Sequence, residues 1–290
     1  VMNSNLEICS FPDGKSAMLA LTFDDGTLDH LEIAAPELEK RGWRGTFYIN
    51  PQSNDRACSR RLNWDGIREL HRRGHEIGNH SMSHSNPQRL AQEKQFETLA
   101  WEIAETQRQI FEHTGTRPVT YTAPYGAKEE FVSRLLAANN LLETPRRVYI
   151  GENTTPEDFA KIHEQSIQPG TFTVIMFHGV APGYGGWAPV ASKEFFSSML
   201  DAWMESEREL HVGTFAETGS YAERIKHVNL EEIAPDAFLL SLAPEAAHLY
   251  GPVFLRSTEQ QKRIRVNTLP VVPRKNGVFR VYPGSVIALG

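Results

Sequence analysis

Short apolar runs alternate with amphipathic stretches along the larger, N-terminal part of the chain. Residues 17–23 and 172–177 are apolar runs of the length typical of buried parallel strands. Residues 127–141 and 193–210 carry apolar side chains at helical spacing, and 88–114 form the longest such stretch. Repeated strand-then-helix units indicate parallel strands with helices packed outside them. The pattern therefore predicts an α/β barrel.

The pattern of apolar and polar residues changes near residue 229. Before it, the pattern also predicts strands at 45–49, 119–122, 147–150 and 211–215 and helices at 31–38, 64–73 and 216–227. After it come short β-like runs separated by Pro and Gly, at 237–242, 252–256, 263–267 and 278–282. We expect a catalytic domain at 1–228 and a small all-β appendix at 229–290.

Charge and composition narrow the function. The 290 residues carry a net charge of -6, and no Lys/Arg run exceeds a pair, so a nucleic-acid partner is not expected. No apolar stretch approaches the roughly 20 residues that span a bilayer. Val1 and Met2 open the sequence without the apolar segment of a signal peptide. Cys9 and Cys58 could form one bridge or remain two unrelated thiols.

Two adjacent carboxylates, Asp24 and Asp25, follow the first apolar strand and precede Gly26. Such a pair is unfavourable unless something neutralises it, because like charges a few ångströms apart repel. A bound dication would do so, with one carboxylate as its ligand and the neighbour as a base. The alternative is an ordinary turn before Gly26.

His80 and His84 are further candidate ligands for the same dication. A spacing of four predicts two imidazoles on one face of a helical turn, both within reach of one ion. Two His and one Asp leave coordination positions open for water and substrate, as catalytic metal sites do. A chance pair is the alternative, because the chain has 11 His.

Two further clusters follow apolar strands. Residues 121–126 (YTAPYG) contain Pro and Gly, which fix the backbone so that its amides can point into a cleft, or simply form a strand-to-helix turn. His178 directly follows the strand at 172–177. A general acid would sit there, although a rim histidine without a catalytic role is equally compatible.

In this order the four clusters resemble the motifs of the NodB-homology polysaccharide deacetylases, carbohydrate esterase family 4. The matching residues are 22–26, 80–84, 122–126 and 176–178, and the resemblance covers roughly residues 17–227. It implies a distorted (β/α) barrel with a divalent metal held by Asp25, His80 and His84. It also implies Asp24 as general base, His178 as general acid and the backbone amide of Tyr125 as an oxyanion-hole donor.

The third and fourth motifs depart from the family pattern. Thr122 stands where the family carries an arginine that pairs with the base, and threonine cannot make a bidentate ion pair. Arg146 or Arg147 could compensate. Met176 replaces a leucine, which is a tolerable apolar exchange. The family's D-x-x-D-W segment has no clear counterpart, and Glu152 and Asp158 are weak candidates for the acid that orients His178.

Two aromatic residues, Tyr184 and Trp187, lie on a Gly/Pro-rich loop after His178. They could stack on a sugar ring, or Trp187 could cover the barrel core as a lid. We therefore expect an acetylated oligosaccharide or polysaccharide as substrate. Sequence leaves open whether the acetyl group is N- or O-linked, and it does not indicate the oligomeric state.

The sequence thus predicts a metal-dependent carbohydrate deacetylase that uses Zn, with Co, Ni or Mn as other fitting ions. Its rivals are an amidase that acts on a non-sugar C–N bond and a glycan-binding pseudoenzyme. We expect a secreted, periplasmic or cell-surface protein rather than a cytoplasmic one.

Overall fold

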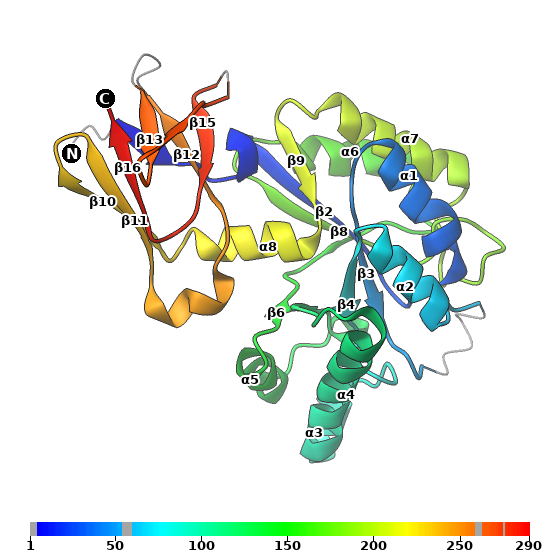
Figure 1. The fold of residues 1–290 in the computed structure, drawn as a ribbon. Coiled ribbons are helices and arrows are strands. Elements are labelled where there is room, and N and C mark those ends of the chain that lie inside the picture. Colours follow the sequence, from blue (N-terminus) through cyan, green and yellow to red (C-terminus); the bar gives the residue numbers. More distant parts are fainter. Residues whose placement is uncertain (1–4, 54–59, 259–262, 275) are drawn as a thin grey trace.

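The computed structural model describes residues 5–53, 60–258, 263–274 and 276–290. Within them, eight parallel strands form a curled, open barrel with helices packed outside it (Figure 1). This confirms the predicted α/β barrel class and its distortion. The strands are β2 (Ala17–Phe23), β3 (Thr46–Ile49), β4 (Glu76–Asn79), β5 (Thr120–Tyr121), β6 (Leu142–Glu143), β7 (Val148–Tyr149), β8 (Phe172–Phe177) and β9 (Leu210–Gly213).

Strand β2 is the centre of this sheet, whose order is β6-β5-β4-β3-β2-β8-β7. All seven of its residues are buried, which explains its uninterrupted apolar sequence. It pairs with β8 along its length, with β3 near its carboxyl end and with β9 near its start. Phe23 stacks on Phe47 and Phe177, with ring centroids 4.9 and 5.3 Å apart, and anchors the core beneath the carboxyl ends of three strands.

Eight helices accompany the sheet in the described part of the chain. They are α1 (Ala35–Lys40), α2 (Trp64–Arg72), α3 (Pro87–Gln92), α4 (Phe96–Thr114), α5 (Glu130–Ala138), α6 (Pro156–Ser166), α7 (Lys193–Glu205) and α8 (Phe215–Arg224). Three short 3-10 helices are η1 (Pro12–Gly14), η3 (Pro124–Gly126) and η4 (Pro244–Leu249), and η2 (His30–Ala34) is a short π-helix. No described helix combines the length and apolarity needed to cross a bilayer.

The long helix predicted over 88–114 was wrong in one respect, because it is two helices. Lys94, with φ 57°, adopts a left-handed conformation between α3 and α4, and this ends the first helix. Helix α6 was not predicted at all. It begins with a capping box in which the side chains of Thr155 and Asp158 bond each other's backbone amides.

The C-terminal residues form two antiparallel sheets beside the barrel (Figure 1). The larger contains β10 (Val228–Ala234), β11 (Ala237–Leu242), β16 (Ser285–Leu289), β13 (Ile264–Val266) and β14 (Leu269–Val271). The smaller contains β12 (Val253–Ser257) and β15 (Val278–Val281), with β1 (Leu6–Ile8) at its edge. Their apolar side chains make a core of their own, separate from that of the barrel.

The N-terminal strand β1 differs from the predicted division of the chain. It pairs antiparallel with β12, and Leu6 is buried in the core of the C-terminal sheets. Residues 6–8 therefore pack with the β-rich part instead of the barrel. That the two cores belong to separate domains divided at residue 228 stays a prediction. Cys9 is a buried free thiol, and Cys58 lies outside the described residues.

Candidate functional site

The parallel register brings the sequence clusters to one rim of the barrel. Phe23 pairs with Phe177, so the residues that follow them, Asp24 and His178, leave neighbouring strands at the same level. Asn79 of β4 pairs with Tyr121 of β5, so His80 emerges beside the turn after β5. The carboxyl ends of parallel strands thus collect the four clusters, as they do in α/β barrels generally.

The two histidines reach this rim by a different route from the predicted one. His80 directly follows strand β4 and His84 lies in the next loop, so the helical turn predicted for them was wrong. Ser81 and His84 have left-handed φ values of 62° and 60°, which fold the loop back on itself. The ring centroids of His80 and His84 lie 5.0 Å apart. A tight loop therefore achieves the convergence that we had expected from helical spacing.

A buried carboxylate, Glu102 of α4, shapes that loop. It is 3% exposed and accepts hydrogen bonds of 2.8 Å from the amides of Met82 and Ser83. It also accepts one from the Ser83 hydroxyl. The side chain of Asn79 accepts a bond from the Ser81 amide. A charged residue on the apolar stripe of a helix was the one sequence signal for this role, and our sequence interpretation missed it.

Replacing Glu102 with alanine should lower the free energy of unfolding by about 2–4 kcal/mol, because two buried amides lose their acceptor. Metal affinity should fall with it, since the loop carries His84. Glu112→Ala is the matched control, an exposed glutamate on the same helix. Urea denaturation compares the variants, and equal stability of both would contradict a loop-building role for Glu102.

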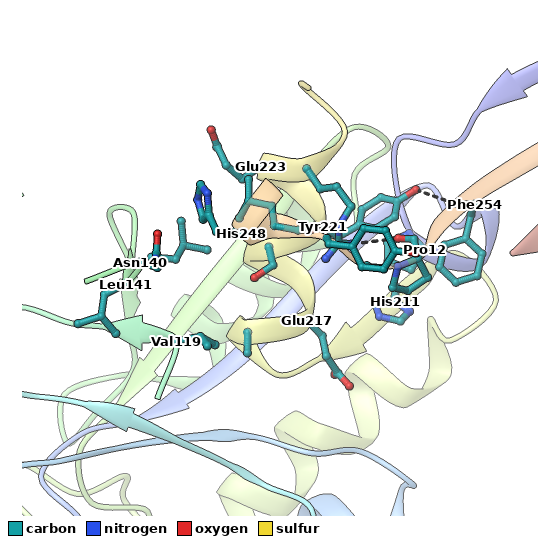
Figure 2. Close-up of a pocket in the computed structure, with 18 of the residues that line it drawn as sticks. Pro12, Val119, Asn140, Leu141, His211, Glu217, Tyr221, Glu223, His248 and Phe254 are labelled. Carbon is teal, nitrogen blue, oxygen red and sulfur yellow. Dashed lines mark hydrogen bonds between the residues drawn. The ribbon is translucent and has the colours of Figure 1, made fainter. Parts of the chain in front are cut away.

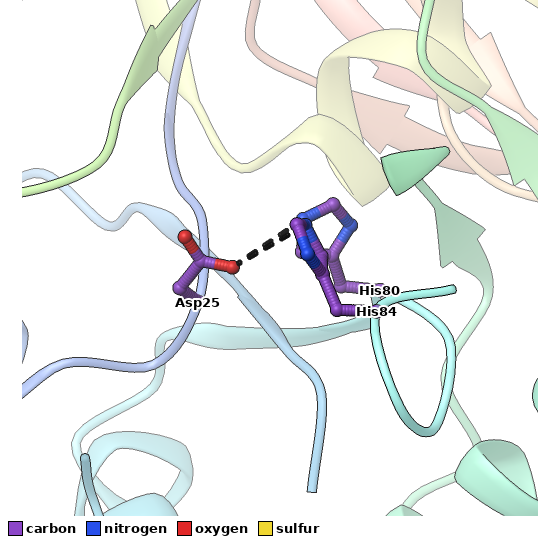
Figure 3. Close-up of side chains that lie close together, drawn as sticks. All are labelled: Asp25, His80 and His84. Carbon is purple, nitrogen blue, oxygen red and sulfur yellow. Dashed lines mark ion pairs between the residues drawn. The ribbon is translucent and has the colours of Figure 1, made fainter. Parts of the chain in front are cut away.

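Asp25, His80 and His84 meet in a geometry suited to one cation (Figure 3). One potential ligand atom from each lies within 4.8 Å of the others. Nε2 of His80 and Nε2 of His84 are each 3.7 Å from Oδ1 of Asp25. That is too long for a hydrogen bond but close to the spacing of atoms that share an ion at about 2.0–2.2 Å. The three side chains therefore form a possible metal site.

His80 is prepared to act as a ligand. Its Nδ1 donates 2.8 Å to the carbonyl oxygen of Thr122, which leaves the lone pair of Nε2 directed toward Asp25. Burial lowers the pKa of His80 to about 4, against the opposing effect of the nearby Asp24 and Asp25 carboxylates. The imidazole is therefore neutral near pH 7, as metal binding requires.

Asp24 is paired with Arg147, which comes from the segment just before β7. The two guanidinium nitrogens donate to the two carboxylate oxygens, each at 2.7 Å. The Asp24 and Arg147 side chains are 2% and 7% exposed. Burial alone would raise the pKa of Asp24, but Arg147 together with His80 holds that pKa below its ordinary value. The carboxylate is thus kept ionised.

The Asp24–Arg147 ion pair explains why Thr122 can stand where the family carries an arginine. The Thr122 hydroxyl bonds the Thr144 hydroxyl at 2.9 Å and forms no ion pair, as its chemistry requires. Of the two arginines that could have compensated, Arg146 is exposed and Arg147 reaches the carboxylate. An arginine is therefore retained at the base, but it is supplied by a later segment. No sequence signal distinguished Arg147 from its neighbour.

His178 lies at the rim against two aromatic rings, Tyr149 and Trp187, with centroids 5.7 and 4.6 Å from its own. Burial lowers its pKa, partly offset by the carboxylates of Asp24 and Asp25. Its Nδ1 is buried and has no hydrogen-bond partner among the described residues. Asp158, considered as an orienting acid, instead caps α6. Glu152 is exposed and forms no hydrogen bond or ion pair with His178 in the described structure.

The backbone next to His178 is held by residues to which the sequence assigned no role. Nε2 of His30 lies 2.6 Å from the His178 carbonyl oxygen. Oδ2 of Asp29 accepts 2.6 Å from the Val180 amide. Both residues are fully buried. They lie five and six residues after Asp24, so the segment that follows the carboxylate pair also supports the loop that begins at His178.

Tyr184 and Trp187, the two candidates for substrate contact, lie in different places, and the oxyanion-hole candidate Tyr125 joins Trp187 at the rim cavity. Trp187 is 47% exposed, and Tyr125 is 67% exposed with its ring 4.8 Å from that of His84. Both line the cavity at the rim. Tyr184 does not: it packs against the barrel core under the Arg60 guanidinium, 5.9 Å from the ring centroid. Of the two loop aromatics, only Trp187 faces the candidate site.

The rim cavity has a volume of about 390 Å³, within the range of small-ligand sites. It is lined by Asp24, Asp25, His80, His84, Ala123, Tyr125, Gly126, Arg147, Met176, His178 and Trp187. Carboxylates, imidazoles and aromatic rings therefore face one space. Such a convergence of titratable groups with shifted pKa values is the usual mark of a catalytic site.

A larger cavity of about 780 Å³ lies between α8, η4 and the end of α5 (Figure 2). Its walls are mostly apolar, and several of its polar side chains serve the fold. His211 pairs with Asp13, Glu223 pairs with Lys226, and Glu217 caps α8. No group of metal-binding residues was found there in the described structure. The rim cavity is thus the better candidate for chemistry.

Comparison with known proteins finds a related family. The family model described as polysaccharide deacetylase matches residues 12–142. This part of the chain is similar to the polysaccharide deacetylase family. The resemblance to NodB-homology deacetylases is thereby confirmed. The match covers the carboxylate pair, both histidines and the turn that contains Tyr125.

Two curated deacetylases are similar to this chain. A chitin deacetylase of Arthroderma benhamiae is 28% identical over 125 residues, which are 41% of this chain and 30% of the relative. A peptidoglycan-N-acetylglucosamine deacetylase of Listeria monocytogenes is 30% identical over 135 residues, 45% of this chain and 26% of the relative. The matched stretch therefore spans less than a third of either relative's length.

Solved structures share the fold. A family 4 carbohydrate esterase from Streptomyces lividans, in complex with acetate, is 22% identical, covering 69% of this chain and 93% of its own, with a TM-score of 0.50. A family 4 pseudoenzyme from Bacillus anthracis is 18% identical, covering 70% and 65%, with a TM-score of 0.53. At these identities the likeness establishes the barrel fold alone.

Proposed function

We propose that this chain is a metal-dependent hydrolase that removes acetyl groups from an acetylated oligosaccharide or polysaccharide. The observation that carries the proposal is the shared rim cavity. It combines a possible Asp–His–His metal site, a carboxylate kept ionised by an arginine, and His178, which lines the same cavity. The family match and the chitin and peptidoglycan deacetylases among the relatives support a deacetylase reaction.

A zinc ion suits the donor set of the candidate site. One carboxylate oxygen and two imidazole nitrogens are ligands that Zn²⁺ prefers, although Co²⁺, Ni²⁺ and Mn²⁺ also accept them. The neutral state of His80 and its hydrogen bond to Thr122 support the fit. When bound, such an ion polarises the acetyl carbonyl and makes a nearby water more acidic.

The chain's own residues would move the protons. Asp24, held ionised by Arg147, would accept a proton as the water oxygen bonds to the acetyl carbon. The backbone amide of Tyr125 would donate a hydrogen bond to the oxygen that becomes negative. His178 would then give a proton to the leaving amine or alcohol as its bond to the acetyl carbon breaks. The products are acetate and the deacetylated sugar.

Acetate release tests the proposal directly. Purified protein should release acetate from acetylated chitooligosaccharide or acetylated xylan, and a chelator should stop the release until Zn²⁺ is restored. Elemental analysis of protein purified without added metal identifies the ion. Release that is indifferent to chelation would contradict the metal requirement. Release from only one of the two probes would separate N- from O-deacetylation.

Glycan binding without turnover is a second candidate, favoured by one observation. Nδ1 of His178 lacks an orienting partner among the described residues, so nothing in them fixes the tautomer needed for proton donation. Saccharide binding without acetate release from either probe would support this function over catalysis. The same outcome combined with cleavage of a non-sugar acetamide would support an amidase.

The similarity to proteins named as chitin and peptidoglycan-N-acetylglucosamine deacetylases supports a location outside the cytoplasm. We propose a secreted, periplasmic or cell-surface protein on this basis.

A further inference from the structure

Asn50, the residue that follows β3, contacts the candidate metal ligand Asp25 directly. Its Nδ2 donates to Oδ1 of Asp25 at 2.8 Å. The same oxygen lies 3.7 Å from Nε2 of both His80 and His84. Asn50 is 3% exposed, so this hydrogen bond is sheltered from water. The asparagine therefore bonds the carboxylate oxygen that faces both imidazoles.

Arg61 determines which way the Asn50 amide points. Its Nη1 donates to Oδ1 of Asn50. An arginine is only a donor, so the amide oxygen must face Arg61 and the amide nitrogen must face Asp25. The same Nη1 donates 2.8 Å to the backbone carbonyl oxygen of Asp25. Arg61 thus fixes both the backbone and, through Asn50, the side chain of one residue.

The backbone around Asp25 is clamped by the segment that carries Arg61. The Leu62 amide donates to the Gly26 carbonyl oxygen at 2.8 Å, and the Leu28 amide donates to that of Arg60 at 2.9 Å. Asp25 itself has a φ of 77°, a left-handed conformation that a non-glycine residue adopts only when its surroundings impose it. Several independent contacts therefore hold this carboxylate in one orientation.

We infer that Asn50, oriented by Arg61, is a positioning residue that sets the affinity of the Asp25–His80–His84 site for its metal. The inference rests on the proposed function, because it assigns a role toward the ion that the function requires. Without the Asn50 bond, the Asp25 side chain gains rotational freedom that metal binding must then remove. Partners behind metal ligands commonly change affinity by about 10–100-fold.

Cobalt(II) titration of the purified full chain tests this role, with the absorption bands of the bound ion as the readout. Asn50→Leu preserves size but removes the donor, and it should weaken cobalt binding about 10–100-fold and alter the bands. Arg61→Met should weaken binding in the same direction. Asn63→Ala is the matched control: it removes the asparagine that caps α2 and does not touch Asp25.

Melting temperatures of the metal-free variants show how much stability each substitution costs. Asn63→Ala then shows how a loss of stability alone affects cobalt binding. If Asn50→Leu does not fold, the smaller change Asn50→Ala takes its place. Parent-like affinity and bands in a folded Asn50 variant would overturn the inference. A parent protein that binds no cobalt or zinc would instead refute the proposed function, so the two failures are distinguishable.

Discussion

Asp24→Asn should lower kcat by about 10²–10⁴-fold, the usual contribution of a general base. The substitution keeps the shape of the side chain but removes its ability to accept a proton from water at neutral pH. Substrate binding should change far less, because a proton transfer assists only the transition state. Steady-state acetate release, measured on the substrate that the parent protein cleaves, gives kcat and KM separately.

Two measurements distinguish the loss of a base from a loss of folded protein in Asp24→Asn. Metal affinity should stay within a few fold of the parent value, because Asp25, His80 and His84 remain in place. Asp158→Asn is the control, since Asp158 caps α6 and does not contact His178. Its turnover should equal that of the parent. Unchanged turnover in Asp24→Asn would remove Asp24 from the role of base.

Arg147→Met should lower both stability and turnover. It leaves the Asp24 carboxylate buried without a counter-ion, and breaking a buried ion pair in this way costs about 3–5 kcal/mol. Burial then raises the pKa of Asp24 without opposition from the arginine, so the base is ionised only at higher pH. The acidic limb of the kcat/KM profile should therefore move to higher pH.

The neighbouring arginine supplies the control. Arg146 is exposed, and Arg146→Met should leave denaturation and the pH profile unchanged. Arg147→Lys should fall between the two, because lysine keeps the charge but cannot form two parallel hydrogen bonds with a carboxylate. If Arg147→Met matched Arg146→Met in both measurements, Arg147 would not be the partner that keeps Asp24 ionised.

The two helical expectations that failed have local causes. Glu93–Gln95 interrupt the predicted helix over 88–114, although the apolar stripe runs through it, because Lys94 adopts a left-handed conformation that side-chain periodicity does not reveal. The sequence around His80 and His84 has helical spacing but begins with strand β4. A spacing of four fits either a helical turn or a folded loop, and the choice depends on contacts with Glu102 of a distant helix.

The sequence by itself determined the parts of this protein that depend on neighbours in the chain. The buried run of β2 ends at Asp24 and Asp25, and that of β8 ends at His178, so periodicity and polarity were enough to predict the strands, the barrel and the rim on which these side chains lie. The family match confirmed the resemblance that these motifs carried.

Only the tertiary structure decided which distant groups meet. Arg147 pairs with a carboxylate 123 positions away. Glu102 accepts a hydrogen bond from Ser83, which lies 19 positions before it, and so shapes the loop of His84. Strand β1 joins a sheet formed by the other end of the chain. The spacing of residues in the sequence does not reveal such contacts, because the partner of a buried charge is whichever opposite charge lies near it in the folded molecule. The distinction between Arg146 and Arg147 is therefore made by packing alone.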